Sequence, residues 1–173
     1  MDAVEQHRTY APDNLGFAVL SASDSRTEAD DRGGDIIASA VVGAGHAVLV
    51  RQVVPDEIEV IRSTTLSLIQ RSEIDVIVLT GGTGFSPRDV SVEAISRLFE
   101  RTIDGFGELF RMLSHRQVGA AAMLSRACGG VSGETPVFLL PGSSKAVQLA
   151  MEQLILPEVG HLIGQIRRPR EAR

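Results

Sequence analysis

The chain of 173 residues has a formal net charge of −5, with 43% hydrophobic and 23% charged residues, which suits one globular domain with a substantial core. The acidic balance, without a basic stripe, argues against nucleic acid as a partner. No apolar run is long enough to span a membrane and the polar amino terminus lacks the layout of a signal peptide, so we expect a cytoplasmic protein with no membrane partner.

Apolar runs that are typical of strands alternate with stretches whose apolar residues recur at helical spacing. The run over 74–79 is the most apolar in the chain and is typical of a strand covered on both faces of a parallel sheet. Glycines and prolines separate the segments. The predicted strands are 15–22, 47–54, 74–79 and 135–141, and the predicted helices are 31–42, 55–72, 91–101, 105–115 and 143–156.

This alternation predicts an α/β fold with three layers, α/β/α, around a mostly parallel central sheet. We expect one domain over 15–164, a polar extension over 1–14 and a charged tail over 165–173. In such sheets ligands bind at the carboxyl ends of the strands, where the strand order reverses. The loops after the predicted strands are therefore the candidates for a functional site.

The loop "TGGTG" follows the most apolar strand directly. Gly81, Gly82 and Gly84 allow backbone angles closed to other residues and a close approach to a ligand. Amide groups that converge at a strand end bind anions, so phosphate is one reading of the loop, and a tight turn that needs several glycines is the other. The spacing matches neither the dinucleotide-binding fingerprint nor the P-loop.

Two aspartates follow neighbouring predicted strands. Asp56 opens the helix after the second strand, and Asp89 lies five residues beyond Gly84. Carboxylates beside bound phosphates hold Mg²⁺ through one or two side chains. Each aspartate taken singly is more typical of a helix cap than of a metal ligand. Their occurrence together with the glycine-rich loop favours the magnesium reading.

Several other residues have structural interpretations. Cys128 is the only cysteine, so it forms no disulfide within the chain and is expected to be a buried, inert thiol. Phe106, Phe110 and Met112 are interpreted as core residues. Asp31 suits the first turn of a helix, where the dipole favours an acid. The four histidines lack the spacing of zinc ligands.

Five sequence blocks carry a resemblance to a known family. They are "LSASDSRTEADDRGG", "TGGTGFSPRDVSVEAI", "IDGFGELFRMLS", "AMLSRACGGV" and "LLPGSSKAV". In this order and spacing the chain resembles the molybdenum cofactor biosynthesis proteins of the MoaB and MogA type. The resemblance implies a molybdopterin-binding fold that assembles as a homotrimer or hexamer. It also implies an adenylyltransferase that joins molybdopterin to AMP from MgATP and releases pyrophosphate, with other molybdenum cofactor synthesis proteins as possible partners.

The resemblance also implies roles for individual residues. Asp56 and Asp89 match the two aspartates associated with catalysis, and we assign them the Mg²⁺ ion and the nucleotide phosphates. The other positions match residues around the nucleotide and the pterin. They are Ser21, Ser23, Asp24, Arg26, Thr80, Gly81, Gly82, Thr83, Gly84, Glu108, Ser114, Ser125, Arg126, Pro141, Gly142, Ser143 and Lys145.

Two alternatives to this enzyme stay open. A paralogue could bind molybdopterin or another protein without turnover, although the retained Asp56 favours catalysis. The related domain of molybdate-insertion proteins or competence-damage-type pyrophosphatases normally belongs to longer chains, so the length argues against it. The chain departs from the family at Ser91, Val92 and Glu93, where a Thr-Pro pair is frequent; Ser91 keeps the hydroxyl.

Overall fold

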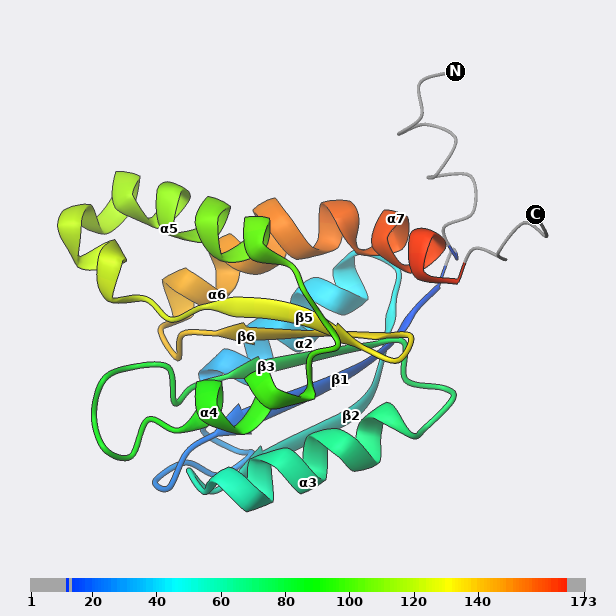
Figure 1. Cartoon of the computed structure of the whole chain (residues 1–173), viewed down its shortest axis with the longest axis horizontal. Helices are drawn as coiled ribbons and strands as arrows, with labels where there is room; N and C mark the ends of the chain where they lie inside the picture. Colours follow the sequence, from blue (N-terminus) through cyan, green and yellow to red (C-terminus); the bar gives the residue numbers. More distant parts are fainter. Residues whose placement is uncertain (1–11, 13, 168–173) are drawn as a thin grey trace.

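The computed structural model describes residue 12 and residues 14–167. In this part of the chain a six-stranded sheet has the order β2-β1-β3-β6-β5-β4 (Figure 1). The strands are β1 (Gly16–Ala22), β2 (Ala47–Val54), β3 (Val76–Thr80), β4 (Arg101–Thr102), β5 (Cys128–Ser132) and β6 (Thr135–Leu140). The helices are α2 (Arg32–Gly43), α3 (Ile58–Ile69), α4 (Ser91–Ile95), α5 (Asp104–Val118), α6 (Ser144–Ala150) and α7 (Leu156–Ile166), with 3₁₀ segments η1 (Ser96–Leu98) and η2 (Gly119–Leu124) and the π-helix η3 (Met151–Ile155).

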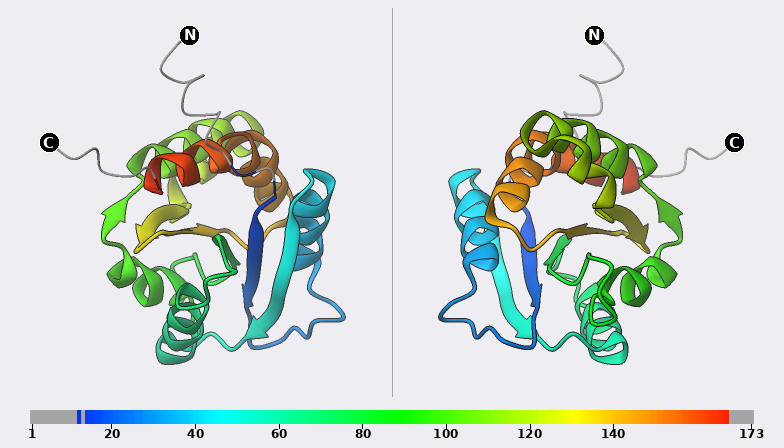
Figure 2. Two further views of the ribbon diagram at one scale, coloured as in Figure 1. Left: turned by 90° about the vertical axis from the view of Figure 1, so that its right-hand side faces the viewer. Right: turned by 90° about the vertical axis from the view of Figure 1, so that its left-hand side faces the viewer.

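Helices cover both faces of the sheet, so the predicted three-layer α/β/α fold is confirmed (Figure 2). The helices α2, α5, α6 and α7 pack on one face, and α3 and α4 pack on the other. The strands β2, β1, β3 and β6 are parallel to one another, whereas at the edge β5 is antiparallel to β6 and β4 is antiparallel to β5. The prediction of a mostly parallel sheet is therefore correct. None of the helices in the described part of the chain has the length and apolarity needed to cross a membrane.

The two hydrophobic cores follow from the alternation of side chains along each strand. On β1, Phe17 and Val19 belong to the core beneath α2, α5 and α7, whereas Ala18 and Leu20 belong to the core beneath α3 and α4. Every residue of β3 is buried. This burial on both faces explains why the sequence of β3 is a continuous apolar run.

The strand β5 was not among the predicted elements, because its sequence, Cys-Gly-Gly-Val-Ser, has low strand propensity. Tertiary packing explains the glycines. A Cβ atom on Gly130 would lie 2.2 Å from Cγ of Phe99, and one on Gly129 would lie 3.0 Å from Cδ1 of Phe138. The aromatic rings occupy the space that side chains on β5 would need, so glycine is required there.

The last helical segment continues further than the sequence predicts. The pattern predicts an end at residue 156, before Pro157, but α7 extends to Ile166. Pro157 lies in the first turn of α7, directly after η3, where the hydrogen bonding changes from π-helical to α-helical. A proline is tolerated there because its missing N–H is not needed in a first turn. The first two residues of the predicted tail therefore belong to α7, and Arg167 donates a hydrogen bond of 2.6 Å to Asp75. Residues 168–173 and most of the predicted extension over 1–14 lie outside the described residues.

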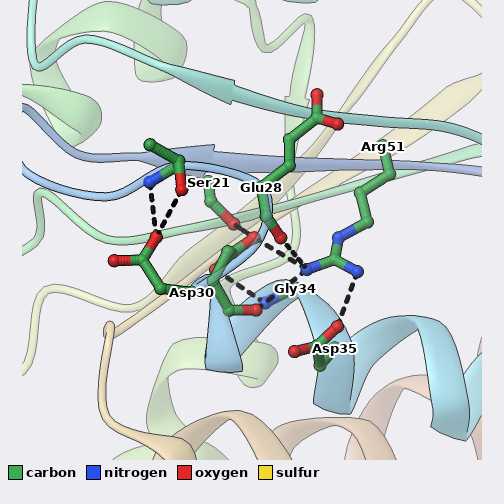
Figure 3. A network of polar contacts seen from close by, with 8 residues as sticks. Ser21, Glu28, Asp30, Gly34, Asp35 and Arg51 are labelled. Carbon is green, nitrogen blue, oxygen red and sulfur yellow. Dashed lines mark hydrogen bonds and ion pairs between the residues drawn. The ribbon is translucent and has the colours of Figure 1, made fainter.

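A buried carboxylate joins the first loop to α2 and β2. Asp31 is 1% exposed, and its Oδ1 accepts from the N–H of Gly34 at 3.0 Å, which caps α2 and confirms the predicted helix start. Its Oδ2 accepts from the hydroxyl of Ser21 at 2.6 Å. The guanidinium of Arg51 binds the carbonyl of Asp31 at 2.9 Å and the carboxylate of Asp35 at 2.6 Å (Figure 3). These bonds fix the start of the first loop on the sheet.

We expect Asp31→Ala to lower the free energy of unfolding by about 3 kcal/mol, because it removes a helix cap and the buried partner of a cation. The matched variant Asp35→Ala removes an exposed partner of the same Arg51 and should lower it by less than about 1 kcal/mol. Urea denaturation at neutral pH gives both values. Equal losses in the two variants would show that the buried network contributes no more than a surface ion pair.

Candidate functional site

The crevice lies between β1 and β3, where the order of the strands reverses. Three loops meet there, one after β1, the glycine-rich loop after β3 and a loop after β6. They line a cavity of about 210 Å³. Six of the predicted ligand-binding residues line it: Ser21, Ser23, Arg26, Thr80, Gly81 and Gly142.

The glycine-rich loop needs its glycines for two reasons. Gly81 and Gly82 have φ angles of +97° and +62°, which residues with a Cβ atom rarely adopt. A Cβ atom on Gly81 would also lie 2.4 Å from the carbonyl oxygen of Ala22. The N–H of Gly81 donates to the carbonyl of Leu140 at 3.1 Å. An anion in this loop would therefore bind to the amides that follow Gly81.

Two aspartates tie the loop after β1 to the loop after β2. The N–H of Asp24 donates to Oδ2 of Asp56 at 3.2 Å, and the N–H of Asp56 donates to Oδ1 of Asp24 at 3.0 Å. The guanidinium of Arg88 donates to Oδ2 of Asp24 through Nε at 2.9 Å and through Nη2. The Arg88 side chain holds the pKa of Asp24 below its ordinary value. Arg88, which was not predicted as a site residue, thus connects the glycine-rich loop to the first loop.

The negative charge of the Asp56 carboxylate is less well compensated than that of Asp24, which is paired with Arg88. Burial raises the pKa of Asp56 above its ordinary value, and the nearby carboxylates of Asp24 and Asp89 raise it further. Its Oδ1 is buried and has no hydrogen-bond partner in the described part of the chain. An acceptor of this kind requires a donor or a cation.

The cap interpretations of Asp56 and Asp89 are wrong. The residue that caps α3 is Glu57 and the residue that caps α4 is Val90, and neither makes a side-chain capping bond. Both predicted catalytic carboxylates are thus available for another role.

The carboxylate of Asp89 packs against the glycine-rich loop. Its Oδ2 accepts from the N–H of Ser86 at 3.0 Å. A Cβ atom on Gly84 would lie 2.7 Å from the same oxygen. The missing side chain of Gly84 therefore lets the carboxylate lie directly against the loop.

Arg126 uses its guanidinium to hold this loop. Nε donates to the carbonyl of Thr83 at 3.1 Å, and Nη2 donates to the carbonyls of Gly84 at 2.5 Å and Asp89 at 2.9 Å. Nη1 donates to Glu93 at 2.5 Å. The resemblance places Arg126 near the pterin, and these bonds also make it a support for the loop that carries Asp89.

Five predicted ligand-binding hydroxyls have partners within the fold. Ser21 and Thr80 donate their protons, to Asp31 and to the carbonyl of Pro141. The others accept from backbone amides: Ser23 from Ser25 and Arg26, Ser125 from Ala127, and Ser143 from Ala146. A hydroxyl that accepts still has a proton to donate, so Ser23 is better suited to a phosphate than Ser21 or Thr80.

Four predicted residues, Glu108, Ser114, Arg126 and Lys145, do not line the cavity of the crevice. Glu108 and Arg126 line a second hollow of about 480 Å³ between α5, β5 and the segment after the glycine-rich loop. Lys145 lies at another hollow, beside Gln117 and Glu152. Ser114 is half-buried on α5. The structure therefore divides the predicted positions among separate surfaces.

Within residues 12 and 14–167 no three or more His, Cys, Asp or Glu side chains are grouped to hold a metal ion. A Mg²⁺ ion at this site would depend on Asp56 and Asp89 and on phosphate oxygens of a substrate. The buried, unpartnered Oδ1 of Asp56 fits such an ion, because a hard cation takes oxygen ligands.

Most of the structural interpretations are confirmed. Cys128 is half-buried, not fully buried as the sequence predicts, and the burial that it has raises the pKa of its thiol to about 11, so the thiol stays protonated at neutral pH. Phe106 and Phe110 are buried in the core. Met112 is 49% exposed, so the core interpretation is wrong for this residue, which lies on the other side of α5 from the two phenylalanines.

Comparisons with known proteins agree with this architecture. Residues 18–161 match the family model described as "Probable molybdopterin binding domain". The molybdenum cofactor biosynthesis protein B of Bacillus anthracis is 44% identical over 167 residues, which cover 96% of this chain and 99% of that protein. A crystal structure of a molybdenum cofactor biosynthesis protein B, 44% identical, has a TM-score of 0.89 over 92% of this chain and 99% of that one. The tungsten cofactor synthesizing protein MoaB of Pyrococcus furiosus, 34% identical, has a TM-score of 0.81 over 91% of this chain and 100% of that one.

We expect Arg126→Met to loosen the glycine-rich loop, because three carbonyls and a carboxylate lose their donor. The free energy of unfolding should fall by about 2 kcal/mol, and the amides of residues 82–89 should exchange faster with solvent. Hydrogen exchange with mass spectrometry resolves this segment. The matched control is Arg62→Met, since Arg62 donates to the carbonyl of Ala94 and to Glu59. Unchanged exchange of residues 82–89 in the Arg126 variant would contradict the supporting role.

We expect Asp56→Asn to be more stable than the wild-type protein at pH 7. The raised pKa means that the folded protein resists ionisation of Asp56, so stability falls as the pH rises from the ordinary value of about 4 through the folded pKa. The amide of asparagine does not ionise, so the variant avoids this loss of stability. The difference in stability between the variant and the wild-type protein should vanish below about pH 4. Urea midpoints between about pH 4 and pH 7 test this.

Asp24→Asn should show the opposite sign. Arg88 lowers the pKa of Asp24, so the carboxylate stabilises the fold above its ordinary pKa and this contribution is lost as the pH falls through the folded pKa. The variant should be less stable than the wild-type protein at pH 7 and equal to it in strong acid. If both variants changed stability in the same direction, the charge arrangement described for the crevice would be incorrect.

Proposed function

This chain belongs to the molybdenum cofactor biosynthesis protein B family, and from that premise we propose that it is a molybdopterin adenylyltransferase. Its role lies in molybdenum cofactor biosynthesis. The proposed reaction transfers AMP from ATP to molybdopterin and releases pyrophosphate. The observation that carries the proposal is the pair of carboxylates, Asp56 and Asp89, which lie against Gly82 and Gly84 of the glycine-rich loop.

The cavity of about 210 Å³ is the proposed site of the reacting phosphates. The amides after Gly81 and the hydroxyl of Ser23 are donors of the kind that phosphate oxygens accept, and Arg26 adds a positive charge at the cavity wall. Asp31 also lines this cavity, but its carboxylate is engaged by Ser21, Gly34 and Arg51.

Asp56 and Asp89 would hold Mg²⁺ together with the phosphate oxygens of ATP. When bound, the ion supplies positive charge that offsets the charge of the phosphates in the transition state. The carboxylates suit this task because Asp56 has an oxygen without a partner and Asp89 is fixed against the loop by Ser86.

In the proposed step, an oxygen of the terminal phosphate of molybdopterin attacks the α-phosphorus of ATP. A new P–O bond forms, the bond between the α-phosphorus and the bridging oxygen breaks, and pyrophosphate leaves with the electron pair. The protein contributes by positioning the two phosphates in line and by stabilising their charge. The support of the glycine-rich loop by Arg126 is part of this positioning.

We assign the pterin ring to the second hollow, of about 480 Å³. Val92, Phe99 and Ile103 give it apolar walls, and Asp104 and Glu108 add carboxylates at its edge. A flat ring with amino and amide groups suits such a lining, because its faces are apolar and its N–H groups can donate to carboxylates. Arg126 lines this hollow and contacts the glycine-rich loop, so it lies between the two proposed subsites.

A homotrimer or hexamer is the proposed assembly. Large apolar side chains are exposed on α5 and η2, and contacts with another copy would remove them from water. They are Leu109, Met112, Val118, Met123 and Leu124. Other molybdenum cofactor synthesis proteins are the alternative partners of this surface.

The test is transfer of AMP to molybdopterin by the purified protein with MgATP. We expect pterin-dependent pyrophosphate release and an adenylylated product, and a loss of about a hundredfold or more in both Asp56→Ala and Asp89→Ala. The matched control is Glu57→Ala, an exposed carboxylate next to Asp56 that makes no capping bond. If the wild-type protein binds molybdopterin and forms no product, a non-catalytic binding or regulatory role replaces the proposed reaction.

A further inference from the structure

The hydroxyl of Ser91 is buried at the base of the candidate site. Ser91 is 0% exposed and is the first residue of α4. Its N–H donates to the carbonyl of Gly82 at 3.1 Å, which fixes the residue against the glycine-rich loop. Its Oγ has no hydrogen-bond partner among the described residues. Buried hydroxyls in folded proteins are nearly always paired, so this one requires an explanation.

The same stretch of loop adjoins a second unpartnered oxygen. Oδ2 of Asp56 accepts from the N–H of Asp24, whereas Oδ1 of Asp56 is buried without a partner. A Cβ atom on Gly82 would lie 2.3 Å from Oγ of Ser91 and 3.1 Å from Oδ1 of Asp56. A donor and an acceptor without partners thus face the same bare Cα atom.

We propose that Ser91 is a positioning residue for Asp56, whose Oδ1 accepts a hydrogen bond from the Ser91 hydroxyl across the Cα atom of Gly82. A rotation of the two side chains brings them together, and no atom of Gly82 blocks the path because glycine has no side chain. The bond fixes the direction of the carboxylate. Since a carboxylate oxygen has two lone pairs, one stays available for a ligand in the crevice.

The surroundings of Ser91 leave few other partners for its hydroxyl. The cap of α4 is Val90, so Ser91 is not a capping residue, and at the first helical position it has no preceding turn whose carbonyl it could reach. The groups that face Asp56 are Asp24, Arg88 and Asp89. Of these, Arg88 is bound to Asp24, and the hydroxyl of Ser91 is a buried side-chain donor without a partner that adjoins Gly82 together with Oδ1 of Asp56.

A double-mutant cycle in stability tests the bond without any ligand. We expect Ser91→Ala to lower the urea midpoint of the wild-type protein and to leave that of Asp56→Ala unchanged. Ser91→Thr keeps the hydroxyl and should retain the wild-type midpoint. The extra methyl group of threonine could disturb the packing, so Ser91→Cys provides a second variant. It keeps the side-chain volume with a much weaker donor and should lower the urea midpoint as Ser91→Ala does.

The matched control is Ser132→Ala, which removes another buried hydroxyl at the far end of the sheet. It should have the same effect in the wild-type and Asp56→Ala backgrounds. The proposal is overturned if Ser91→Ala raises the midpoint equally in both backgrounds, because the hydroxyl would then be an unpaired group whose removal is favourable.

A second cycle, which rests on the proposed function, measures the dissociation constant of MgATP by calorimetry. We expect Ser91→Ala to weaken binding about tenfold, the size typical of one hydrogen bond to a charged group, and to add nothing in the Asp56→Ala background. Ser91→Thr should restore the affinity. Additive losses would overturn the positioning role. If the wild-type protein binds no MgATP, the proposed function fails, while the stability cycle still decides whether Ser91 and Asp56 are bonded.

Discussion

The parallel pairing of β1 with β3 determines where the candidate functional groups can lie. Phe17 is opposite Val76 and Ser21 is opposite Thr80, so the two strands end at the same level. The chain then leaves them toward opposite sides, because β2 lies beyond β1 and β6 lies beyond β3. The crevice is a consequence of this strand order, and short loops are enough to bring distant parts of the sequence together.

The charges of the crevice suit phosphates that arrive with a cation. Arg51 compensates Asp31 and Arg88 compensates Asp24, so these acids are already paired within the fold. Asp56 has a raised pKa because burial and like charges outweigh its partners. Negative charge of this kind repels a bare phosphate beside the loop and attracts one that shares a divalent ion, which is how magnesium nucleotides bind.

The elements that could be predicted from the sequence are those whose pattern is local. Every residue of β1, β3 and β6 is buried, and a continuous apolar run in the sequence is the pattern that such burial produces. The glycines of β5 depend instead on a contact with a residue distant in sequence, since the ring of Phe99 is what requires a glycine at position 130. The same distinction applies to the site. Asp56 and Asp89 could be selected as candidates because each lies shortly after a strand or the glycine-rich loop in sequence, whereas the contacts of Arg88 and Arg126 join residues 64 and 42 positions apart.

The contacts of Arg126 mean that the sequence of the glycine-rich loop does not determine the loop's conformation by itself. Three carbonyls between Thr83 and Asp89 depend on a side chain from the segment before β5. The motif alone, introduced into another α/β sheet, would keep its sequence but would not adopt the same loop conformation. Recombination between relatives meets the same restriction, because a crossover between the loop and residue 126 separates two parts that have to match. The portable unit is therefore the loop together with its arginine.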